Sequence, residues 1–505
     1  MGVIRCRGPW TSKEVALDEK TALNPYLPAW EYVPDGEPHI FEGRLYVFGS
    51  HDEDGGNEFC LGDYVGWSAP LDDLGNWRYE GVIYRKEQDP QQQDPTIPSL
   101  STRAGKPHLI FAPDVARGPD GRYYLYYSMD LSGVVSVAVC DQPAGRYEYW
   151  GKVACPDGTV PKDFVWFDPA VLVEDSGIYL YSGSAPTKHY PGMPEKIPGA
   201  MVVRLAEDMK TIVSEPVCVA NGPETAQGTS FAEHPFFEAS SIRHFGAWYY
   251  FVYSSLQGHE LCYAMSCSPE GPFTYKGVLV SNGDLGREGN QQPQYYMGNN
   301  HGGMEQIGGR YYIFWHRHTH GGQFSRQGCA DEILLQPDGT FRQAEITSCG
   351  LNGGPLPARE RRYPASIACC LQGPDKEKMK QLLPLQPQHR TETDIPYVNG
   401  AKEPGHPEGY RSWLEKLRPG SVFGFKYFDF GAGCVILSMT LRGQGQVTLH
   451  LDAPEGPALA ELAADSDVWV TVQTEVPSLT GVHSVYFTVS GREAARLDCA
   501  DLCFE

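Results

Sequence analysis

The chain of 505 residues has no long hydrophobic run and little positive charge. No apolar stretch approaches the roughly 18 residues of a membrane-spanning helix, and the first twenty residues lack the apolar core of a secretory signal peptide. Lysine and arginine number 41 against 63 aspartates and glutamates, a formal net charge of −22. This balance argues against nucleic acid or an anionic membrane as a partner and suits a neutral or cationic ligand. We therefore expect a cytoplasmic protein.

Paired cysteine motifs are also missing. The fourteen cysteines form no CxxC pair, and two of them, Cys369 and Cys370, are adjacent. This arrangement is typical of reduced thiols rather than of a disulfide framework. Cys499 and Cys503 are spaced so that they could pair or bind a metal, but the spacing alone is not specific.

Glycine, proline and tyrosine are abundant, with 56, 40 and 29 copies, which favours strands and turns over helices. One phrase recurs, a turn followed by an aromatic strand. Its five copies are GRLYVFGS (43–50), GRYYLYYS (121–128), GIYLYSG (177–183), AWYYFVYS (247–254) and GRYYIFWH (309–316). Several copies are followed by another strand, a Pro/Gly turn and a last aromatic strand. Four short antiparallel strands repeated five times predict an all-β, five-bladed β-propeller, and an irregular β-rich domain is the alternative.

An ionisable residue stands 9 to 12 residues before the tyrosine of each phrase. These residues are Glu37, Asp114, Asp168, Glu238 and His301. The innermost strand of a propeller blade begins near the axis, so we expect the five side chains to converge. Carboxyl groups buried together have raised pKa values, and two carboxyls with separated pKa values are the groups that hydrolyse glycosides. Clustered oxygens could instead bind a hard cation such as Ca²⁺.

The phrases APDV…GRYYLYYS, FDPAVLVED, FFEASSIRHFGAWYYFVYSS and NNHGGMEQIGGRYYIFWH resemble family 43 glycoside hydrolases over about residues 25–350. The resemblance implies a five-bladed propeller with exo-acting activity, mostly that of β-xylosidases and α-L-arabinofuranosidases. Glu238 then matches the general acid, and Asp168 matches the aspartate that orients this acid and raises its pKa. His301 matches a histidine near the axis, which in relatives is often close to a bound cation or water. We expect no required cofactor, with a structural Ca²⁺ near the axis as an open alternative.

The first blade departs from the family pattern. The general base of the family is an aspartate directly before a proline, and Glu37 holds that place here. A glutamate reaches one methylene further, while inverting hydrolysis needs about 6.5–9.5 Å between the two carboxyls. We predict Glu37 as the base, with Asp35 as the alternative and a weak or differently specialised enzyme as a third reading.

Further residues are predicted to bind the sugar. Asp114 belongs to the converging set, and Trp166 could stack on a sugar face, although aromatic residues are more often buried. Arg326 is placed like a late arginine that reaches the sugar pocket in relatives, and a surface arginine is the alternative. Three histidines alternate along one expected strand, namely His316, His318 and His320. They could share a face and meet one Zn²⁺, but we predict no metal-binding residues in the site.

The repeat stops near residue 350. We predict a propeller over 1–350, a linker and domain-bridging segment over 351–420, and the remainder of a β-sandwich over 421–505, which could start near 360. The last strands alternate apolar and polar residues, as sandwich strands do, and resemble a family 6-type carbohydrate-binding jelly roll. A domain that braces the propeller or completes its pocket is the alternative to sugar binding.

These features together predict an exo-acting, inverting glycoside hydrolase. It would release a terminal pentose, xylose or arabinofuranose, from a short oligosaccharide; the oligomeric state is open. An exo-glycosidase for another sugar such as galactose is one alternative. A non-catalytic sugar-binding propeller is another.

Overall fold

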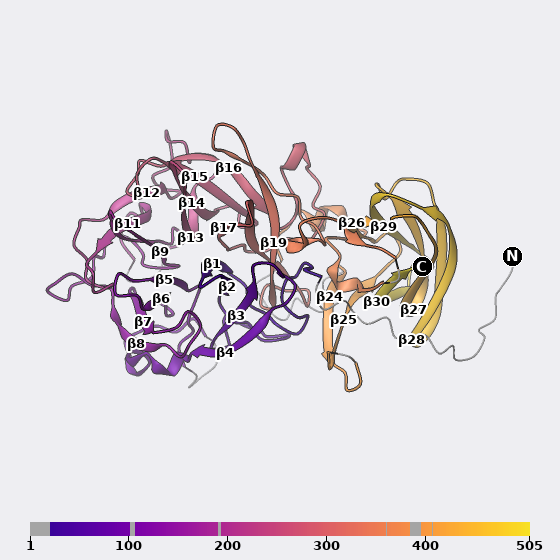
Figure 1. The fold of residues 1–505 in the computed structure, drawn as a ribbon, viewed down its shortest axis with the longest axis horizontal. Helices are drawn as coiled ribbons and strands as arrows, with labels where there is room; N and C mark the ends of the chain where they lie inside the picture. The colour runs from indigo at the N-terminus through magenta and orange to yellow at the C-terminus, as the bar shows by residue number, and fades with distance from the viewer. Residues whose placement is uncertain (1–20, 102–106, 190–192, 360, 384–394, 407) are drawn as a thin grey trace.

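A computed structural model describes residues 21–505 except 102–106, 190–192, 360, 384–394 and 407. Its larger part is a propeller of five four-stranded antiparallel sheets (Figure 1). The first sheet has β1 (Glu37–Phe41), β2 (Arg44–Phe48), β3 (Tyr64–Pro70) and β4 (Arg78–Tyr84). The second has β5 (Asp114–Arg117), β6 (Tyr123–Ser128), β7 (Val135–Cys140) and β8 (Glu148–Lys152). The third has β9 (Ala170–Glu174), β10 (Gly177–Ser182), β11 (Gly199–Leu205) and β12 (Val217–Asn221).

The last two blades follow the same order. The fourth has β13 (Phe236–Phe245), β14 (Trp248–Ser255), β15 (Glu260–Ser266) and β16 (Thr274–Ser281). The fifth has β17 (Met304–Ile307), β18 (Arg310–His318), β19 (Arg326–Leu335) and β20 (Phe341–Arg342). In every blade the strands pair in chain order, and the first strand is innermost, so β1, β5, β9, β13 and β17 surround the axis (Figure 1). The predicted five-bladed propeller is confirmed.

The repeated aromatic phrase forms the second strand of each blade. Some of its side chains pack against the neighbouring blade: Tyr181 of β10 contacts Phe251 of β14, with ring centroids 5.8 Å apart. Separate hydrophobic clusters fill the spaces between successive blades. The ring closes where Gly36 and Gly302 form a parallel bridge and the Gly303 N–H donates to the Gly36 carbonyl at 3.1 Å.

The C-terminal strands form one ten-stranded sheet that curls around its own core (Figure 1). Its strands are β21 (Leu356–Pro357), β22 (Arg361–Pro364), β23 (Cys370–Gln372), β24 (Tyr397–Lys402), β25 (Tyr410–Leu417), β26 (Val422–Asp429), β27 (Cys434–Leu451), β28 (Ala460–Leu479), β29 (Val482–Ser490) and β30 (Arg496–Phe504). The segment expected to be a linker thus contributes five of these strands. A likeness to a family 6-type module stays a prediction.

Helices are short. They are α1 (Lys376–Met379) and the 3₁₀ turns η1 (Lys86–Gln88), η2 (Pro90–Gln93), η3 (Arg287–Gly289), η4 (Gly350–Asn352) and η5 (Ala365–Ile367). Within the described ranges, no helix has the length and apolar character needed to cross a membrane. The thirteen cysteines of these ranges are free thiols, Cys499 and Cys503 included.

The two parts of the molecule share a hydrophobic core. One cluster of buried side chains runs from Ile313 and Trp315 in the fifth blade to Phe425 and Leu437 in the C-terminal sheet. The Lys426 ammonium group, buried in this interface, is 2.9 Å from Glu345 Oε1. The C-terminal sheet therefore packs against blades four and five as part of one core.

Candidate active site

Three of the predicted residues meet at the mouth of the inner strands. Asp168 lies two residues before β9, Glu238 is the third residue of β13, and His301 lies three residues before β17. Asp168 Oδ2 accepts a hydrogen bond from the Ala239 N–H at 3.1 Å and lies 3.5 Å from His301 Nδ1. The structure therefore brings Asp168, Glu238 and His301 together, as the spacing predicted.

The backbone at this site is strained. Asp35, Asp168 and Ala239 adopt left-handed φ angles of 58°, 44° and 69°, a region that non-glycine residues rarely occupy. Such strain persists only where surrounding contacts enforce it, and it is concentrated at functional sites. Glu37 and Asp114 have no such φ angle. By this criterion Asp35 resembles Asp168, and Glu37 does not.

Asp35 is a buried carboxylate held by the last blade. Its Oδ1 accepts from Arg326 Nη1 at 2.8 Å, and its N–H donates to His316 Nδ1 at 3.3 Å. His316 Nε2 faces the Asn299 carbonyl at 2.8 Å and must donate there, which leaves Nδ1 as the acceptor. Burial acts to raise the pKa of Asp35, but the charge of Arg326 and the contributions of His316 and His301 together outweigh burial and hold this pKa well below its usual range. Asp35 is therefore ionised at neutral pH.

Glu238 differs from Asp35 in that its pKa is raised. Burial and, to a smaller extent, the charge of Asp35 raise the pKa of Glu238 to about 7 against the opposing charge of Arg326. Burial also raises the pKa of Asp168 well above its usual range, with further contributions from Glu238 and Asp35. Burial lowers the pKa of His301 to about 4, so this imidazole is neutral. The site thus contains one ionised carboxylate beside a carboxyl that still holds its proton near pH 7.

Glu37 lies in a different cluster of residues. Its Oε1 contacts Arg243 Nη1 at 2.7 Å and accepts from Ser241 Oγ at 2.8 Å. Burial raises the pKa of Glu37 to about 8, Arg243 opposes this rise, and Asp114 adds to it. The strongest electrostatic influences on Glu238 come from Asp35 and Arg326, not from Glu37. The carboxylate whose charge raises the pKa of Glu238 is therefore Asp35 rather than Glu37.

Asp114 belongs to the cluster of Glu37. Its Oδ1 faces His39 Nε2 at 2.6 Å and accepts from the Val115 N–H, and its Oδ2 accepts from the Val171 N–H at 2.6 Å. Asp114 therefore ties the inner strands of three blades together. All of these contacts lie within the protein, so a sugar-binding role for Asp114 has no support in this geometry.

The Glu37–His39–Asp114 group is one place where the alternative structural calcium ion near the axis could bind. Their ligand atoms lie within 4.8 Å of one another, but calcium takes six to eight oxygen ligands. Asp114 has both oxygens engaged, and only Glu37 Oε2 is buried without a hydrogen-bond partner. The Arg243 guanidinium already supplies positive charge at this point. This donor set does not fit calcium.

Arg326 was predicted to bind the sugar, but in the structure its guanidinium group contacts two carboxylates of the protein. Only 3% of it is exposed, and its guanidinium donates to both oxygens of Asp52, at 2.8 and 3.0 Å, as well as to Asp35. Three of the five N–H donors of this guanidinium are therefore engaged by the two carboxylates. Its position makes Arg326 the group that orients Asp35 and stabilises its charge.

Trp166 was predicted to stack on a sugar face, but the structure buries it. It is 4% exposed, packs against Phe164 at 4.4 Å and donates its indole N–H to the Pro161 carbonyl. The ring belongs to the hydrophobic cluster between blades two and three. Phe111 and Phe167 are less buried, and their rings lie 5.3 Å apart. They are the better candidates for contact with a sugar face.

The three alternating histidines bind separate partners. His316 holds Asp35, His318 Nε2 faces Asn299 Oδ1 at 2.8 Å, and His320 Nε2 lies 3.0 Å from Asp54. Within the described residues they are not grouped as metal ligands. Only His316 among them contacts Asp35.

Sequence reasoning gave no role to Asp52, Ser241 or Arg243, because their partners lie in other blades. Asp35 carried a clearer signal. Asp35, Asp168 and His301 each precede the tyrosine of their repeat phrase by eleven residues, whereas Glu37 precedes it by nine. A strict spacing of eleven residues favours Asp35 over Glu37, although it would also pass over Asp114 and Glu238, which precede their tyrosines by ten and twelve residues.

One cavity lies away from these carboxyls. It has a volume of about 660 Å³ and lies between blade four, blade five and the C-terminal sheet, with Arg287, Glu345, Lys426 and Tyr486 among its lining residues. None of the converging acids lines it. This cavity is therefore separate from the candidate active site.

Comparison with known proteins gives the family. The model of glycosyl hydrolases family 43 matches residues 43–341. A xylosidase/arabinosidase of Thermoclostridium stercorarium is 43% identical over 498 residues, which cover 96% of this chain and 99% of that protein. The matched family range begins after Asp35 and Glu37, so it does not distinguish between them.

Solved structures are similar as well. A GH43_1 enzyme from Xanthomonas citri is 26% identical and covers 64% of this chain and 94% of its own, with a TM-score of 0.50. A β-xylosidase/α-arabinofuranosidase from a compost metagenome, solved with xylotriose in a calcium-free form, is 24% identical, covers 64% of this chain and 97% of its own, and has a TM-score of 0.49. The five-bladed propeller, the converging carboxyls and the family match over more than half of the chain lead to one conclusion: this protein belongs to glycosyl hydrolases family 43.

Proposed function

We propose that this protein is an exo-acting glycoside hydrolase that releases terminal xylose or arabinofuranose from short oligosaccharides. The observation that carries the proposal is the pair Asp35 and Glu238. Arg326 holds the pKa of the first low, and burial raises the pKa of the second to about 7. Two carboxyls with separated pKa values are what glycoside hydrolysis requires. The Thermoclostridium stercorarium relative is called a xylosidase/arabinosidase, which supports xylose and arabinofuranose as the released sugars.

In this mechanism Asp35 is the general base and Glu238 the general acid. Asp35 removes a proton from a water molecule, which attacks the anomeric carbon from the face opposite the leaving group. Glu238 gives its proton to the leaving oxygen, and the anomeric configuration inverts. Asp168, whose Oδ2 is bonded to the Ala239 N–H, fixes the backbone next to the acid. Glu37, predicted as the base, is instead a buried partner of Arg243.

We also propose that no calcium ion is needed at Glu37 and Asp114. The Arg243 guanidinium lies 2.7 Å from Glu37 Oε1 and supplies the positive charge there. Dialysis against a calcium chelator should leave kcat/KM unchanged. A loss of activity that added calcium restores would contradict this proposal.

A panel of nitrophenyl glycosides tests the substrate. We expect turnover of the β-xyloside, the α-L-arabinofuranoside or both, and little turnover of galactosides. Proton NMR at early times should show the sugar released with inverted configuration. Release with retained configuration would exclude Asp35 as a base acting through water, and turnover of galactosides alone would exclude the proposed sugar.

A further inference from the structure

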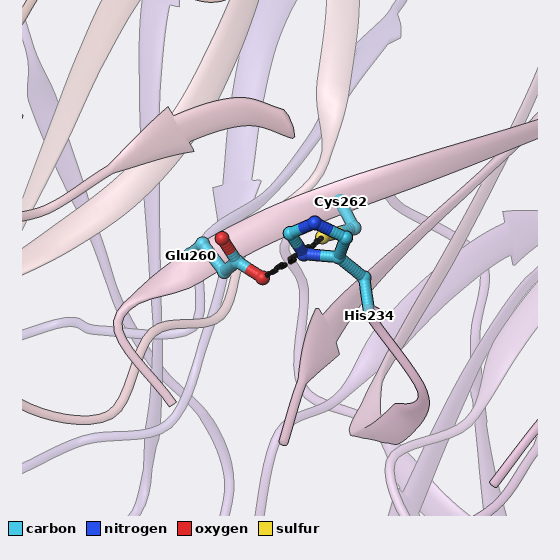
Figure 2. Close-up of side chains that lie close together, drawn as sticks. All are labelled: His234, Glu260 and Cys262. Atoms are coloured by element: carbon cyan, nitrogen blue, oxygen red, sulfur yellow. Dashed lines mark hydrogen bonds and ion pairs between the residues drawn. The ribbon is translucent and has the colours of Figure 1, made fainter. Parts of the chain in front are cut away.

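A second group of chemically reactive side chains lies in blade four, outside the candidate active site. His234 stands two residues before β13, and Glu260 and Cys262 are the first and third residues of β15. Alternate residues of a strand share a face, so Glu260 and Cys262 both face His234. Figure 2 shows the imidazole, the carboxylate and the thiol pointing toward one another. The established family activity gives this group no role.

The distances between the three ligand atoms form a triangle. His234 Nδ1 lies 2.6 Å from Glu260 Oε1, Cys262 Sγ lies 3.4 Å from the same oxygen, and Sγ and Nδ1 are 3.9 Å apart. Tetrahedral zinc has bonds of about 2.0–2.3 Å to such ligands, which places the ligand atoms roughly 3.3–3.6 Å apart. Two sides of the triangle lie within a few tenths of an ångström of this range. Only the imidazole and the carboxylate must separate, by less than about 1 Å.

We propose that His234, Glu260 and Cys262 bind a Zn²⁺ ion. A thiolate, an imidazole and a carboxylate are the zinc ligands of proteins, whereas calcium and magnesium prefer oxygen alone. Binding forms three metal–ligand bonds and releases the proton of the thiol, together with any proton on His234 Nδ1.

The surroundings suit a metal site with one open position. Cys262 and Glu260 are 0% and 5% exposed, but 26% of the His234 side chain is exposed, so a metal and a water ligand have access from that side. The Tyr275 ring stacks on the imidazole, with centroids 4.9 Å apart and planes 11° apart, and fixes its orientation. The Tyr253 hydroxyl donates to the His234 carbonyl at 2.8 Å and holds its backbone.

The ion would stabilise the start of β13. His234 lies four residues before Glu238, and Glu238 pairs with Ser254, the neighbour of Ser255. Ser255 Oγ in turn donates to Glu260 Oε1 at 2.5 Å. A metal bound at His234, Glu260 and Cys262 would connect β13, β14 and β15 next to Glu238. Its role is structural, and the site stands whether or not Glu238 is the acid.

Cobalt binding by the full-length protein tests the site. After treatment with a chelator, the wild-type protein should bind one equivalent of Co²⁺, with a thiolate-to-metal charge-transfer band and the strong visible absorption of tetrahedral cobalt. Zn²⁺ should abolish both features, because it binds the same ligands more tightly. Zn²⁺ should also raise the Tm of the protein.

Matched cysteine variants assign the thiolate. Cys262→Ser should lose the charge-transfer band and weaken Zn²⁺ binding at least tenfold, whereas Cys267→Ser, which changes an exposed cysteine at the end of the same strand, should behave as wild type. The proposal is overturned if wild-type protein shows no charge-transfer band, or if Cys262→Ser retains it. The wild-type spectrum is decisive even if Cys262→Ser does not fold. A metal-free hydrogen-bonded trio would give the first of these results.

Discussion

At the scale of single residues, the decisive feature is the charge next to each carboxyl. Asp35 and Glu37 are two positions apart, but Asp35 faces Arg326 and His316, whereas Glu37 faces Arg243 and Ser241. The charges that matter most for the pKa of Glu238 include Asp35 and not Glu37. The pKa values of these carboxyls therefore depend on partners in distant parts of the chain.

Substitution of the two first-blade acids should separate chemistry from stability. Asp35→Asn should lower kcat by roughly 10²–10⁴ on every substrate, activated or not, because each turnover needs the base. Glu37→Gln keeps the shape of the side chain and replaces a carboxyl that is mostly protonated near pH 7, because the pKa of Glu37 is raised to about 8, so we expect a small change of Tm and a much smaller loss of kcat. Steady-state kinetics and thermal unfolding of both variants measure this.

Azide provides the control for Asp35. In Asp35→Ala a small anion can attack from the vacated water position, so added azide should restore turnover and give a glycosyl azide of inverted configuration. If Glu37→Ala is rescued and Asp35→Ala is not, the base is Glu37.

Glu238→Gln tests the acid through the leaving group. Protonation of the leaving oxygen matters only where that oxygen is basic, so xylobiose hydrolysis should fall by roughly 10²–10⁴, and hydrolysis of an activated nitrophenyl glycoside should fall much less. Equal losses on both substrates would exclude Glu238 as the acid.

The pH profile follows from the two pKa values. Glu238 must hold its proton, and its pKa is raised to about 7, so kcat/KM should fall as the pH rises through about 7. Asp35 must be ionised, and its pKa is well below its usual range, so the acidic limb should lie below about pH 4. Arg326→Lys keeps the positive charge that also acts on Glu238 but weakens the paired hydrogen bonds to the carboxylates, so the acidic limb should move toward higher pH and the alkaline limb should move less. An unchanged acidic limb in Arg326→Lys would contradict the role given to Arg326.

At the scale of elements, the closure of the propeller depends on a close approach of two strands. A Cβ at Gly302 would lie 2.1 Å from the Phe314 carbonyl oxygen, a backbone atom that cannot move aside. Gly302→Ala should therefore push Gly302 away from β18, disturb its bridge to Gly36 and lower the free energy of unfolding by about 1–3 kcal/mol. Gly354→Ala, where a Cβ meets nothing within 4 Å, is the matched control. Equal Tm values for Gly302→Ala and Gly354→Ala would show that the backbone around the Gly36–Gly302 bridge can shift to make room for the added Cβ.

At the scale of the whole molecule, the C-terminal sheet completes the core. Leu371, Phe425 and Leu437 pack in one cluster with residues of blades four and five. The Tyr410 hydroxyl lies 3.0 Å from that of Tyr32, near the site in blade one. A chain ending at residue 350 would expose this apolar surface, which favours aggregation.

Truncation after residue 350 should therefore give insoluble or thermally unstable protein. Size-exclusion chromatography and thermal unfolding measure this, with the full-length chain as the reference. A soluble, fully active fragment of residues 1–350 would show that the C-terminal sheet is dispensable for folding.

The sequence by itself determined the architecture and most of the converging acids. The five aromatic phrases set five equivalent strands, and regular spacing before their tyrosines placed Asp168, Glu238 and His301 at the axis, because each blade repeats the same local pattern. Strand periodicity and turn residues are local properties, so they can be read without the fold.

Only the tertiary structure shows that Trp166 is buried, that Arg326 is engaged by Asp35 and Asp52, and which partners surround Asp35 and Glu37. The proposal of Asp35 as the base rests on those partners. Each answer depends on a contact between distant segments: Arg326 lies 291 residues from Asp35, and Ser241 lies 204 residues from Glu37. A pKa is set by burial and by neighbouring charge, and both exist only once the five blades have closed around the axis.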